Sequence, residues 1–356
     1  RIIDSCRVCG FKKLMPILYL GDLYISDFLE ESEMNEAEKA PLDLVLCNED
    51  DGGCGLLQLK HTVSNEVMYR RYWYFSGTNK TMADELIGIA SKVESLIDLK
   101  DGDYVMDIGV NDGTLLRGYK TIGLNCTGFE PARNLEKFNS VGTKKIINNF
   151  FNYEDWRKEF GDIRAKGITA IAMFYDLDDP NKFVSDIVRC LDKEGIFIIQ
   201  MAYLPSMLLK NMFDNICHEH LEYYSLLSLE NLLKRHGLGV FDVELNDING
   251  GSFRIYIRHQ GGGESIKIPE GARERINNLR ESEKNLGLND KKIYDDFAER
   301  VETIKKDVFN FIKNEVEGGK RVYVYGASTK GNTLLQYFNL DNSLIAAAAE
   351  RNSTKW

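Results

Sequence analysis

Alternation of short apolar runs with longer polar segments constrains the fold of this chain more than any other feature. The apolar runs cover 104–108, 126–130, 167–175 and 195–201, and the polar segments between them leave room for helices. Strands that alternate with helical segments form a parallel sheet covered by helices. We therefore expect an α/β core in the middle of the chain.

Length and periodicity predict further units on both sides of this core. A chain of 356 residues is long for one hydrophobic core, so we expect two or three domains. Apolar residues recur at helical spacing over Met82–Ile97 and Phe297–Phe311, which predicts two helices that each bury one face. An apolar strand at 321–325, a glycine-containing turn and a helix near Leu334 predict a second, smaller Rossmann-type unit.

Charge and composition exclude two classes of partner. The net charge of -10 argues against nucleic-acid binding, which needs clustered Lys and Arg. No apolar run is long enough to cross a bilayer and nothing at the N-terminus resembles a signal peptide, so we expect a cytoplasmic protein without a membrane partner. The chain starts at Arg1 without Met and stops soon after an apparent strand at 344–349, so we expect trimmed ends and an incomplete last domain.

Four of the seven cysteines fall within the first 54 residues. Cys6 and Cys9 form a CxxC knuckle followed by a glycine, and Cys47 and Cys54 form a second, more widely spaced pair. Four thiolates suit a tetrahedral structural zinc ion, which a module this short and poor in core would need. The alternative is four unligated thiols.

The turn after the first strand of the core is typical of a cofactor site. A strand, a glycine-rich turn and a helix from Leu115 can bind NAD, FAD or S-adenosylmethionine (SAM). The turn lacks GxGxxG, and an acidic residue within it would repel a pyrophosphate but suit the cationic sulfonium and amino groups of SAM. At the end of the second strand, Glu130 suits the ribose hydroxyls. The candidate SAM-binding residues are Asp107, Gly109, Asn111, Asp112, Gly113, Glu130 and Pro131. The alternative is an acidic cap at Asp112 and a solvated Glu130.

Two of the five histidines flank Glu219 within a segment rich in aromatic residues. Histidine can take and return a proton near neutral pH, and an adjacent carboxylate can orient the ring or raise its basicity. His218, Glu219 and His220 are therefore candidates for proton abstraction. The alternative for His220 is a buried imidazole bonded to backbone.

Three other segments are candidates for substrate contact. The aromatic run 70–77 is either a lid over the substrate or a surface packed on the first module. The turn with Asn249 and Gly251, followed by Arg254, can approach a ligand closely and reach an anion, or is an ordinary hairpin with an exposed arginine. The segment 328–332 opens a helix whose free amides, with a lysine, can neutralise a diphosphate, or is a capped helix start with a solvated lysine.

These features occur in one order that resembles the nucleotide-sugar C-methyltransferases of the dTDP-sugar C-3 type. The resemblance extends over nearly the whole chain and rests on the CxxC module, the turn 108–116, the block 218–225, the Gly250–Arg254 turn and the turn 326–333. It implies an α/β fold with a Rossmann-like SAM methyltransferase domain at 71–245. A small zinc module at 1–70 would precede this domain, and a truncated, Rossmann-like nucleotide-sugar domain would follow at 246–356.

The resemblance also implies a reaction and residue roles. The substrate would be a 4-keto-6-deoxy sugar nucleotide, whose C3 proton is acidified by the ketone, and the resulting enolate would attack the methyl group of SAM. By position in the motif, His220 matches the family base and Glu219 its orienting acid, with His218 as a second polar contact. Tyr74 matches a family tyrosine near the reacting sugar. The implied substrate-binding residues are Tyr224, Asn249, Gly251, Arg254, Ser328, Lys330 and Asn332.

Two departures from the family pattern concern the same site. Relatives often carry a tyrosine just before His-Glu-His, where this chain has Cys217, and a thiol is a weaker hydrogen-bond donor. The segment 173–180 lacks a histidine found in some relatives, which leaves Tyr175 or Asp176 for another role.

Three other functions compete with carbon methylation. The first is methyl transfer to oxygen or nitrogen of another small molecule, and the second is a non-catalytic module that binds the cofactor and zinc. The third treats both glycine-containing turns as NAD sites. For the carbon methyltransferase we expect a monomer or weak homodimer with a small-molecule nucleotide-sugar substrate.

Overall fold

The computed structural model describes residues 1–25, 35, 37–70 and 72–350. Its largest element is a seven-stranded sheet, in which the five consecutive strands from one edge are parallel. The order across the sheet is β10 (Leu238–Asn246), β11 (Ser252–His259), β8 (Leu191–Ala202), β7 (Ala165–Ile171), β4 (Tyr104–Ile108), β5 (Asn125–Phe129) and β6 (Lys145–Ile147). The strand β11 is antiparallel to both of its neighbours. The expected α/β core is confirmed, because its apolar runs are strands buried on both faces.

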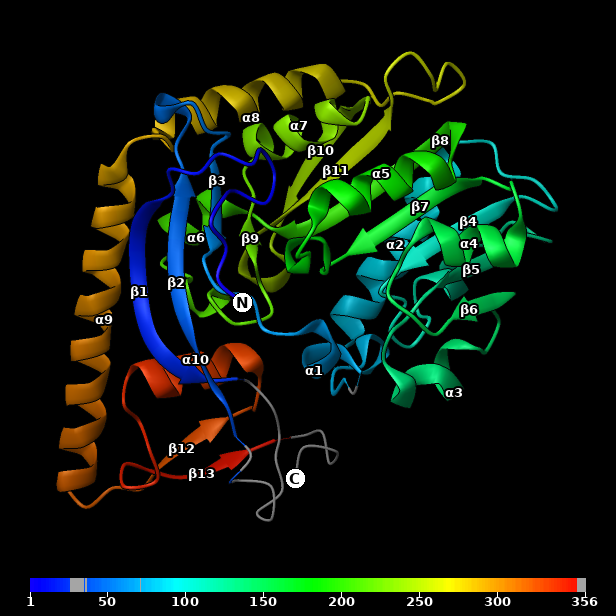
Figure 1. Cartoon of the computed structure of the whole chain (residues 1–356). Helices are drawn as coiled ribbons and strands as arrows, with labels where there is room; N and C mark the ends of the chain where they lie inside the picture. The colour runs from blue at the N-terminus through cyan, green and yellow to red at the C-terminus, as the bar shows by residue number, and fades with distance from the viewer. Residues whose placement is uncertain (26–34, 36, 71, 351–356) are drawn as a thin grey trace.

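Helices cover both faces of this sheet (Figure 1). They are α2 (Lys80–Leu96), α4 (Tyr153–Phe160), α5 (Pro180–Cys190), α7 (Leu226–Arg235) and α8 (Ala272–Leu286). The short helix α3 (Glu136–Asn139) follows β5, and α6 (Leu204–Leu209) packs in a separate hydrophobic cluster with Leu42 and Leu44. The helix expected from Leu115 is wrong, because that segment contains only a single 3₁₀ turn at Leu116–Gly118. A side chain at Gly118 would press on the backbone of α2, so this segment lies too close to α2 for a full helix to be expected there.

A second, four-stranded antiparallel sheet carries the N-terminal cysteines. Its strands are β1 (Met15–Tyr24), β2 (Lys39–Cys47), β3 (Leu56–Leu59) and β9 (Glu222–Tyr223), and α1 (Asn65–Tyr69) follows β3. The strand β9 comes from the segment just after His220, and Leu57 pairs with Tyr223. The N-terminal module is thus joined by backbone hydrogen bonds to the segment that carries the candidate base.

The C-terminal region packs against this second sheet. The long helix α9 (Lys291–Glu317) runs beside β1, and α10 (Thr329–Tyr337) contacts β1 from a neighbouring position (Figure 1). Phe297 and Val301 of the expected apolar stripe are buried there, whereas Phe311 is 65% exposed. The remaining strands, β12 (Val322–Tyr325) and β13 (Ile345–Ala349), form a parallel pair around α10. This β-α-β unit matches the expected local pattern, while a complete second Rossmann-like domain stays a prediction.

Within the described part of the chain, every helix is too short or too polar to span a bilayer.

Candidate active site

A cavity of about 360 Å³ opens at the carboxyl ends of β4, β5 and β7. Other parts of the chain also line it, among them Tyr69, Tyr72 and Tyr74, the loop before β9 and the start of α10. Ligands of open α/β sheets bind at this edge, where loops from neighbouring strands converge. The cavity therefore combines residues of the central core, of the segment before it and of the C-terminal region.

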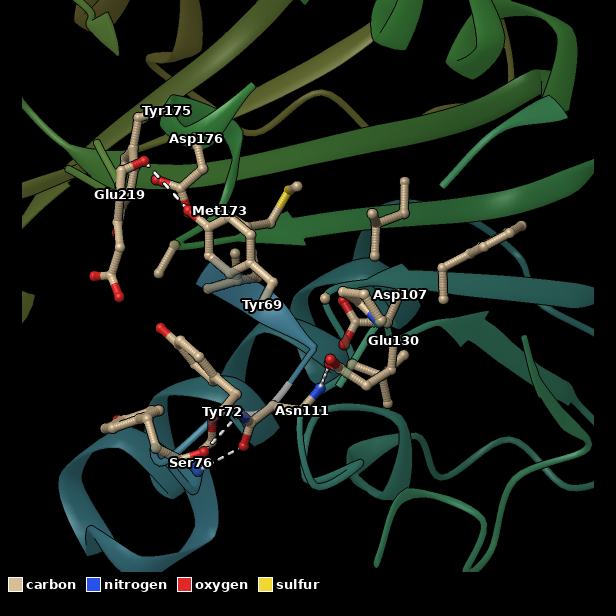
Figure 2. Close-up of a pocket in the computed structure, with 18 of the residues that line it drawn as sticks. Tyr69, Tyr72, Ser76, Asp107, Asn111, Glu130, Met173, Tyr175, Asp176 and Glu219 are labelled. Carbon is tan, nitrogen blue, oxygen red and sulfur yellow. Dashed lines mark hydrogen bonds between the residues drawn. The ribbon is translucent and has the colours of Figure 1, made fainter. Parts of the chain in front are cut away.

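The turn after β4 is held open by left-handed backbone and by one carboxylate. Gly109 and Asn111 have φ angles of 76° and 54°. Glu130, at the end of β5, accepts hydrogen bonds from the amides of Asn111 (2.7 Å) and Ala132 (2.8 Å). These bonds place the Glu130 carboxylate at the edge of the turn, inside the cavity (Figure 2).

Asp107 is the second buried carboxyl at this end of the cavity. It accepts a hydrogen bond of 2.5 Å from the Thr169 hydroxyl. Burial raises the pKa of Asp107 to about 8 and the pKa of Glu130 to about 7. Both groups therefore bind protons readily near neutral pH while the cavity is empty. Pro131 also lines this end.

Asp112 and Gly113 are not among the residues that line the cavity, and their predicted contact with cofactor stays a prediction. Asp112 accepts hydrogen bonds from the Gly77 amide (2.7 Å) and from the hydroxyl of Thr114 (2.6 Å). Both oxygens of its carboxylate therefore bind groups of the protein itself. Gly113 faces Asn139, whose backbone would lie 3.3 Å from an added Cβ. Both residues shape the turn and lie outside the set that lines the cavity.

The aromatic run lies over the cofactor turn. Asn111 joins the two segments, because its side chain accepts a hydrogen bond from the Ser76 amide (2.9 Å) and donates one to the Tyr74 carbonyl (2.9 Å) (Figure 2). The side chains of Tyr69, Tyr72 and Tyr74 line the cavity. This placement agrees with the lid interpretation of the run, apart from Arg71, which lies outside the described residues.

His220 is fixed in one tautomer by its neighbours. Its Nδ1 lies 2.8 Å from the carbonyl oxygen of Asn215, and because a carbonyl can only accept, Nδ1 carries the hydrogen. The other ring nitrogen, Nε2, is then left with its lone pair. The ring packs on Tyr175, with 4.2 Å between centroids. Desolvation, and secondarily the charge of Lys330, lower the pKa of His220 to about 3, so the imidazole is neutral at physiological pH.

Glu219 lines the cavity beside His220. Burial raises the pKa of Glu219 to about 7, while the hydroxyl of Thr329 and the charge of Lys330 act in the opposite direction. Cys217 lies behind the pair, within 4.8 Å of the other two ligand atoms, and desolvation raises the pKa of its thiol well above the usual range. The residue that replaces the family tyrosine is therefore a neutral thiol.

His218 and Tyr224 are not among the residues that line the cavity, and their predicted contacts with substrate stay predictions. His218 Nε2 lies 2.9 Å from the carbonyl of Ala40 on β2. Tyr224 is fully buried, with its ring against Phe174 in the core. Both side chains therefore contact other parts of the protein.

The hairpin before β11 contributes one residue to the cavity. Asn249, with a φ of 54°, lines it, whereas Gly251 does not. Arg254 is a second correction in this segment, because its guanidinium is paired with Glu85 (2.5 Å) and hydrogen-bonded to Gln200 (2.8 Å). Arg254 is 8% exposed, and its polar contacts are made inside the protein.

The N-terminus of α10 forms the far wall of the cavity. Ser328 caps the helix by accepting a hydrogen bond from the Gly331 amide (3.0 Å), and Ser328, Thr329 and Lys330 line the cavity. Asn332 lies one turn further on, outside the lining set. Among the described residues that line the cavity, Lys330 is the only Lys or Arg.

Several residues that line the cavity were not assigned a role from the sequence. Tyr69 precedes the aromatic run and was not singled out, Tyr72 belongs to a run that was identified only as a whole, and the choice between Tyr175 and Asp176 was left open. All four line the cavity. The signal that could have identified them is their position after a strand of the sheet or just before the cofactor turn.

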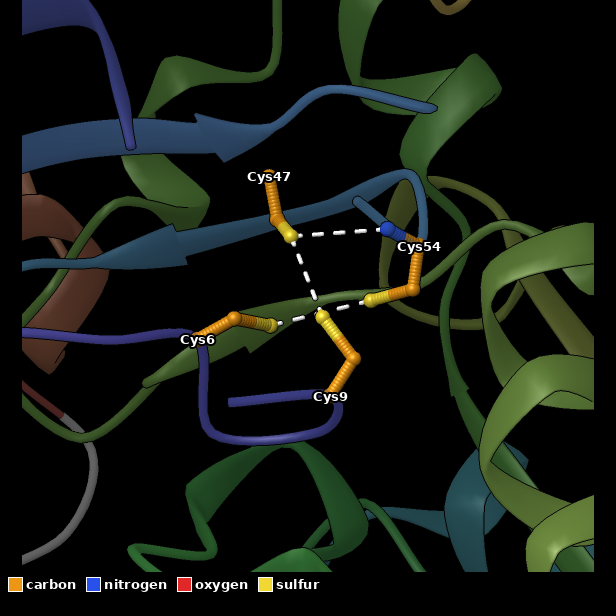
Figure 3. A group of neighbouring side chains, drawn as sticks. All are labelled: Cys6, Cys9, Cys47 and Cys54. Carbon is orange, nitrogen blue, oxygen red and sulfur yellow. Dashed lines mark hydrogen bonds between the residues drawn. The ribbon is translucent and has the colours of Figure 1, made fainter. Parts of the chain in front are cut away.

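The four N-terminal cysteines converge on one point (Figure 3). All four sulfur atoms lie within 4.8 Å of one another, with Cys9 and Cys47 3.4 Å apart and Cys6 and Cys54 3.6 Å apart. A tetrahedron with Zn–S bonds of about 2.3 Å has edges of about 3.8 Å, so the cluster fits zinc. A side chain at Gly53 would come within 2.6 Å of the Cys47 sulfur, which explains the glycine there.

Comparisons with known proteins match three consecutive parts of the chain. Residues 6–69 match a family described as "Putative zinc binding domain", 80–243 match "Methyltransferase domain" and 247–356 match "C-methyltransferase C-terminal domain". The chain is 28% identical to the C-methyltransferase NovU of Streptomyces niveus over 360 residues, which cover 100% of this chain and 83% of NovU.

Solved structures resemble about half of the chain. The CcbJ methyltransferase from Streptomyces caelestis is 12% identical, with 49% of this chain and 89% of that chain covered and a TM-score of 0.38. The mitomycin 7-O-methyltransferase MmcR is 18% identical, with 51% and 55% covered and a TM-score of 0.38. Scores this low carry no argument on function.

Proposed function

We propose a substrate and mechanism for this chain, which belongs to the C-methyltransferase family that joins an N-terminal zinc-binding region, a methyltransferase domain and a C-terminal C-methyltransferase domain. The chain is a SAM-dependent C-methyltransferase. The reaction that we propose is methylation of the carbon beside the ketone of a nucleotide-linked 4-keto-6-deoxy sugar. His220 is the base.

The observation that carries this proposal is the state of the His220 ring. The Asn215 carbonyl fixes Nδ1 as the hydrogen-bond donor, so Nε2 is a free proton acceptor in the cavity that the cofactor turn also lines. A base positioned in this way removes a proton from a carbon that an adjacent ketone acidifies. Its pKa of about 3 makes it a weak base in the empty cavity. A substrate phosphate near Lys330 would offset part of that lowering, because Lys330 is its second cause.

The reaction consists of the removal of one carbon-bound proton and the formation of one carbon–carbon bond. His220 Nε2 takes the carbon-bound proton, and the electron pair left behind makes an enolate. When bound, SAM would supply an electrophilic methyl group, and the electron pair of the broken sulfur–methyl bond would stay on sulfur, so that S-adenosylhomocysteine leaves. The carbonyl re-forms as the new carbon–carbon bond is made, and His220 returns its proton to solvent. The Asn215 carbonyl orients the base, and Glu219, which lines the cavity beside the ring, contacts the sugar hydroxyls.

We assign the cofactor to the end of the cavity that contains Asp107 and Glu130. The two carboxyls suit the amino group and the ribose hydroxyls of SAM, and the left-handed backbone of Gly109 and Asn111 allows close approach. The residues present thus fit the cofactor in charge and in shape. The aromatic side chains of the overlying run would exclude water from the reacting atoms.

We assign the nucleotide sugar to the opposite end. Lys330 and the N-terminus of α10 suit a diphosphate, because a helix N-terminus and an ammonium group both attract anions. Asn249 and Tyr74 are placed to contact the sugar. In this assignment the C-terminal region supplies the substrate-binding wall.

Binding of SAM is expected to release protons near neutral pH. Asp107 and Glu130 have raised pKa values of about 8 and about 7 in the empty cavity, and a bound cation favours their ionised forms. Affinity should therefore increase as the pH rises from about 6 to about 9. Isothermal titration calorimetry in buffers of different ionisation enthalpy measures the released protons.

The Glu130→Gln variant provides the control for this titration, because a glutamine has no proton to release. It should bind SAM more weakly and release fewer protons than the wild type. Affinity that does not change with pH, with no dependence on the buffer, would contradict the placement of SAM against these carboxyls.

One incubation tests the proposed reaction. The protein is mixed with SAM and dTDP-4-keto-6-deoxyglucose as the probe, and the product is analysed by mass spectrometry and NMR. We expect a sugar that is one methyl group heavier, with the new methyl carbon bonded to carbon. A methyl group on oxygen or nitrogen, or no product with any keto-sugar nucleotide, would contradict the proposal.

A further inference from the structure

Asp176 is a carboxyl group in the cavity that the mechanism above does not use. It ends the short 3₁₀ helix Phe174–Asp176 that follows β7, and it lines the same cavity as His220. Its Oδ1 is sealed from solvent and has no hydrogen-bond partner among the described residues. Figure 2 shows its carboxyl group between the ring of Tyr69 and the Glu219 segment.

The surroundings of Asp176 oppose a negative charge. Two other carboxyls, Glu219 and Glu222, act on it, and within the described ranges no Lys, Arg or His forms an ion pair with it. Tyr69 alone favours the ionised form, through a hydrogen bond. Desolvation, followed by the charges of Glu219 and Glu222, raises the pKa of Asp176 well above its usual range.

A neutral carboxylic acid has an O–H group that requires an acceptor. The adjacent Tyr69 hydroxyl lies 3.3 Å from the Glu219 carbonyl, where it donates its hydrogen. The Tyr69 oxygen can then accept a hydrogen bond from one oxygen of Asp176, whereas Oδ1 has no partner among the described residues, beside a cavity that receives a ligand. A carbonyl oxygen of that ligand is an acceptor of the right kind.

We propose that Asp176 is a catalytic acid that stays protonated and donates a hydrogen bond to the substrate carbonyl oxygen as negative charge develops there. This inference rests on the proposed enolate chemistry. His220 takes the proton from carbon while Asp176 keeps its own and shares it with the enolate oxygen. When the carbon–carbon bond forms, the electron pair leaves the oxygen and the carbonyl is restored.

The physical advantage comes from the low polarity of the site. A carboxylic acid kept neutral by its surroundings can donate a hydrogen bond to an oxygen that becomes negative in the transition state. A donor fixed in advance stabilises that charge without a cost of reorganisation. Tyr69, whose hydroxyl is bonded to Asp176, acts as a positioning residue for the acid.

The test compares Asp176→Ala, Asp176→Asn and the wild type with dTDP-4-keto-6-deoxyglucose and SAM. The alanine variant removes the donor and should lower kcat by on the order of 10²–10³-fold with little change in KM. The asparagine variant keeps an N–H donor of similar shape and should retain much more activity than alanine. Asp178→Asn is the matched control, because Asp178 pairs with Arg1 on the other side of the loop.

The pH profile separates a catalytic from a structural role. If Asp176 must be protonated, the kcat of the wild type falls as the pH rises through the pKa of Asp176, and the fall is absent in Asp176→Asn. SAM binding and thermal unfolding show whether each variant is folded. An unchanged kcat in the alanine variant, or the same alkaline fall in wild type and Asp176→Asn, would overturn the inference.

The failure of the proposed function has a different signature. In that case the wild type itself makes no carbon-methylated product and exchanges no hydrogen from the probe, and the role of Asp176 falls with it. A wild type that methylates carbon, beside an alanine variant of equal activity, contradicts the role of Asp176 alone.

Discussion

Replacing His220 with alanine is expected to lower the kcat of carbon methylation by on the order of 10²–10⁴-fold, the usual contribution of a positioned base. The loss should affect kcat more than KM, because the ring contacts the reacting proton and not the nucleotide. SAM binding should be unchanged, since the cofactor turn lies at the other end of the cavity. Steady-state kinetics and calorimetry on the same preparation measure the two effects.

His259 offers the matched control for this experiment. It lies on β11, where Nε2 contacts the carbonyl of Leu191, outside the cavity. His259→Ala should keep the kcat of the wild type. If His220→Ala retains full kcat while the protein is folded and binds SAM, another group removes the proton.

Removing zinc is expected to unfold the N-terminal module. In small zinc-dependent domains metal binding contributes on the order of 10 kcal/mol to folding at neutral pH. The cysteines belong to the main hydrophobic core, where Cys47 is fully buried and Cys6 and Cys54 are each 3% exposed. Chelation, or the Cys47→Ser variant, should therefore lower the thermal unfolding temperature strongly.

Activity should be lost together with the metal. The amide of Leu59 on β3 donates to the carbonyl of Leu221, and β3 pairs with β9 directly after the candidate base. Loss of the cluster therefore loosens the segment that holds His220. Zinc content, unfolding temperature and kcat are measured before and after chelation. Cys126→Ala, outside the cluster, should retain one zinc ion per chain, whereas a protein that is stable and active without metal would contradict the structural role.

Most of the central fold could be predicted because it depends on local patterns. The strands β4 and β5 are buried on both faces, so each appears in the sequence as a short continuous apolar run. The segment after Leu115 was mispredicted as a helix because its close packing against α2 is a tertiary feature. The addition of β9 to the N-terminal sheet is equally non-local, since its two residues pair with a strand more than 160 positions away.

The parts of the site that could be predicted are those in which the spacing of residues along the sequence indicates their chemical role. Four cysteines in two pairs indicated one metal site, and the structure brings all four together. The roles of Asp107 and Glu130 depended on their position at the ends of strands, and both line the cavity. Their contact with SAM stays a prediction.

The misplaced residues share a physical reason. Arg254 was expected to reach an anion, but its partner Glu85 is 169 positions away in the sequence. Tyr224 belongs to the same block as His220, but its ring packs against Phe174 in the core, a contact that only the fold creates. Asp176 could not be assigned because its neutral state depends on Glu219 and Glu222, which only the fold brings near it.

Exchange of hydrogen at the carbon beside the ketone tests the central claim most directly. Wild type and His220→Ala are incubated with dTDP-4-keto-6-deoxyglucose in deuterated water without SAM, and NMR follows the carbon-bound hydrogen. The account predicts that deuterium enters C3 in the presence of the wild type and that this exchange is nearly lost in the variant. Exchange at equal rates in both, or none with a wild type that still methylates carbon, would contradict it.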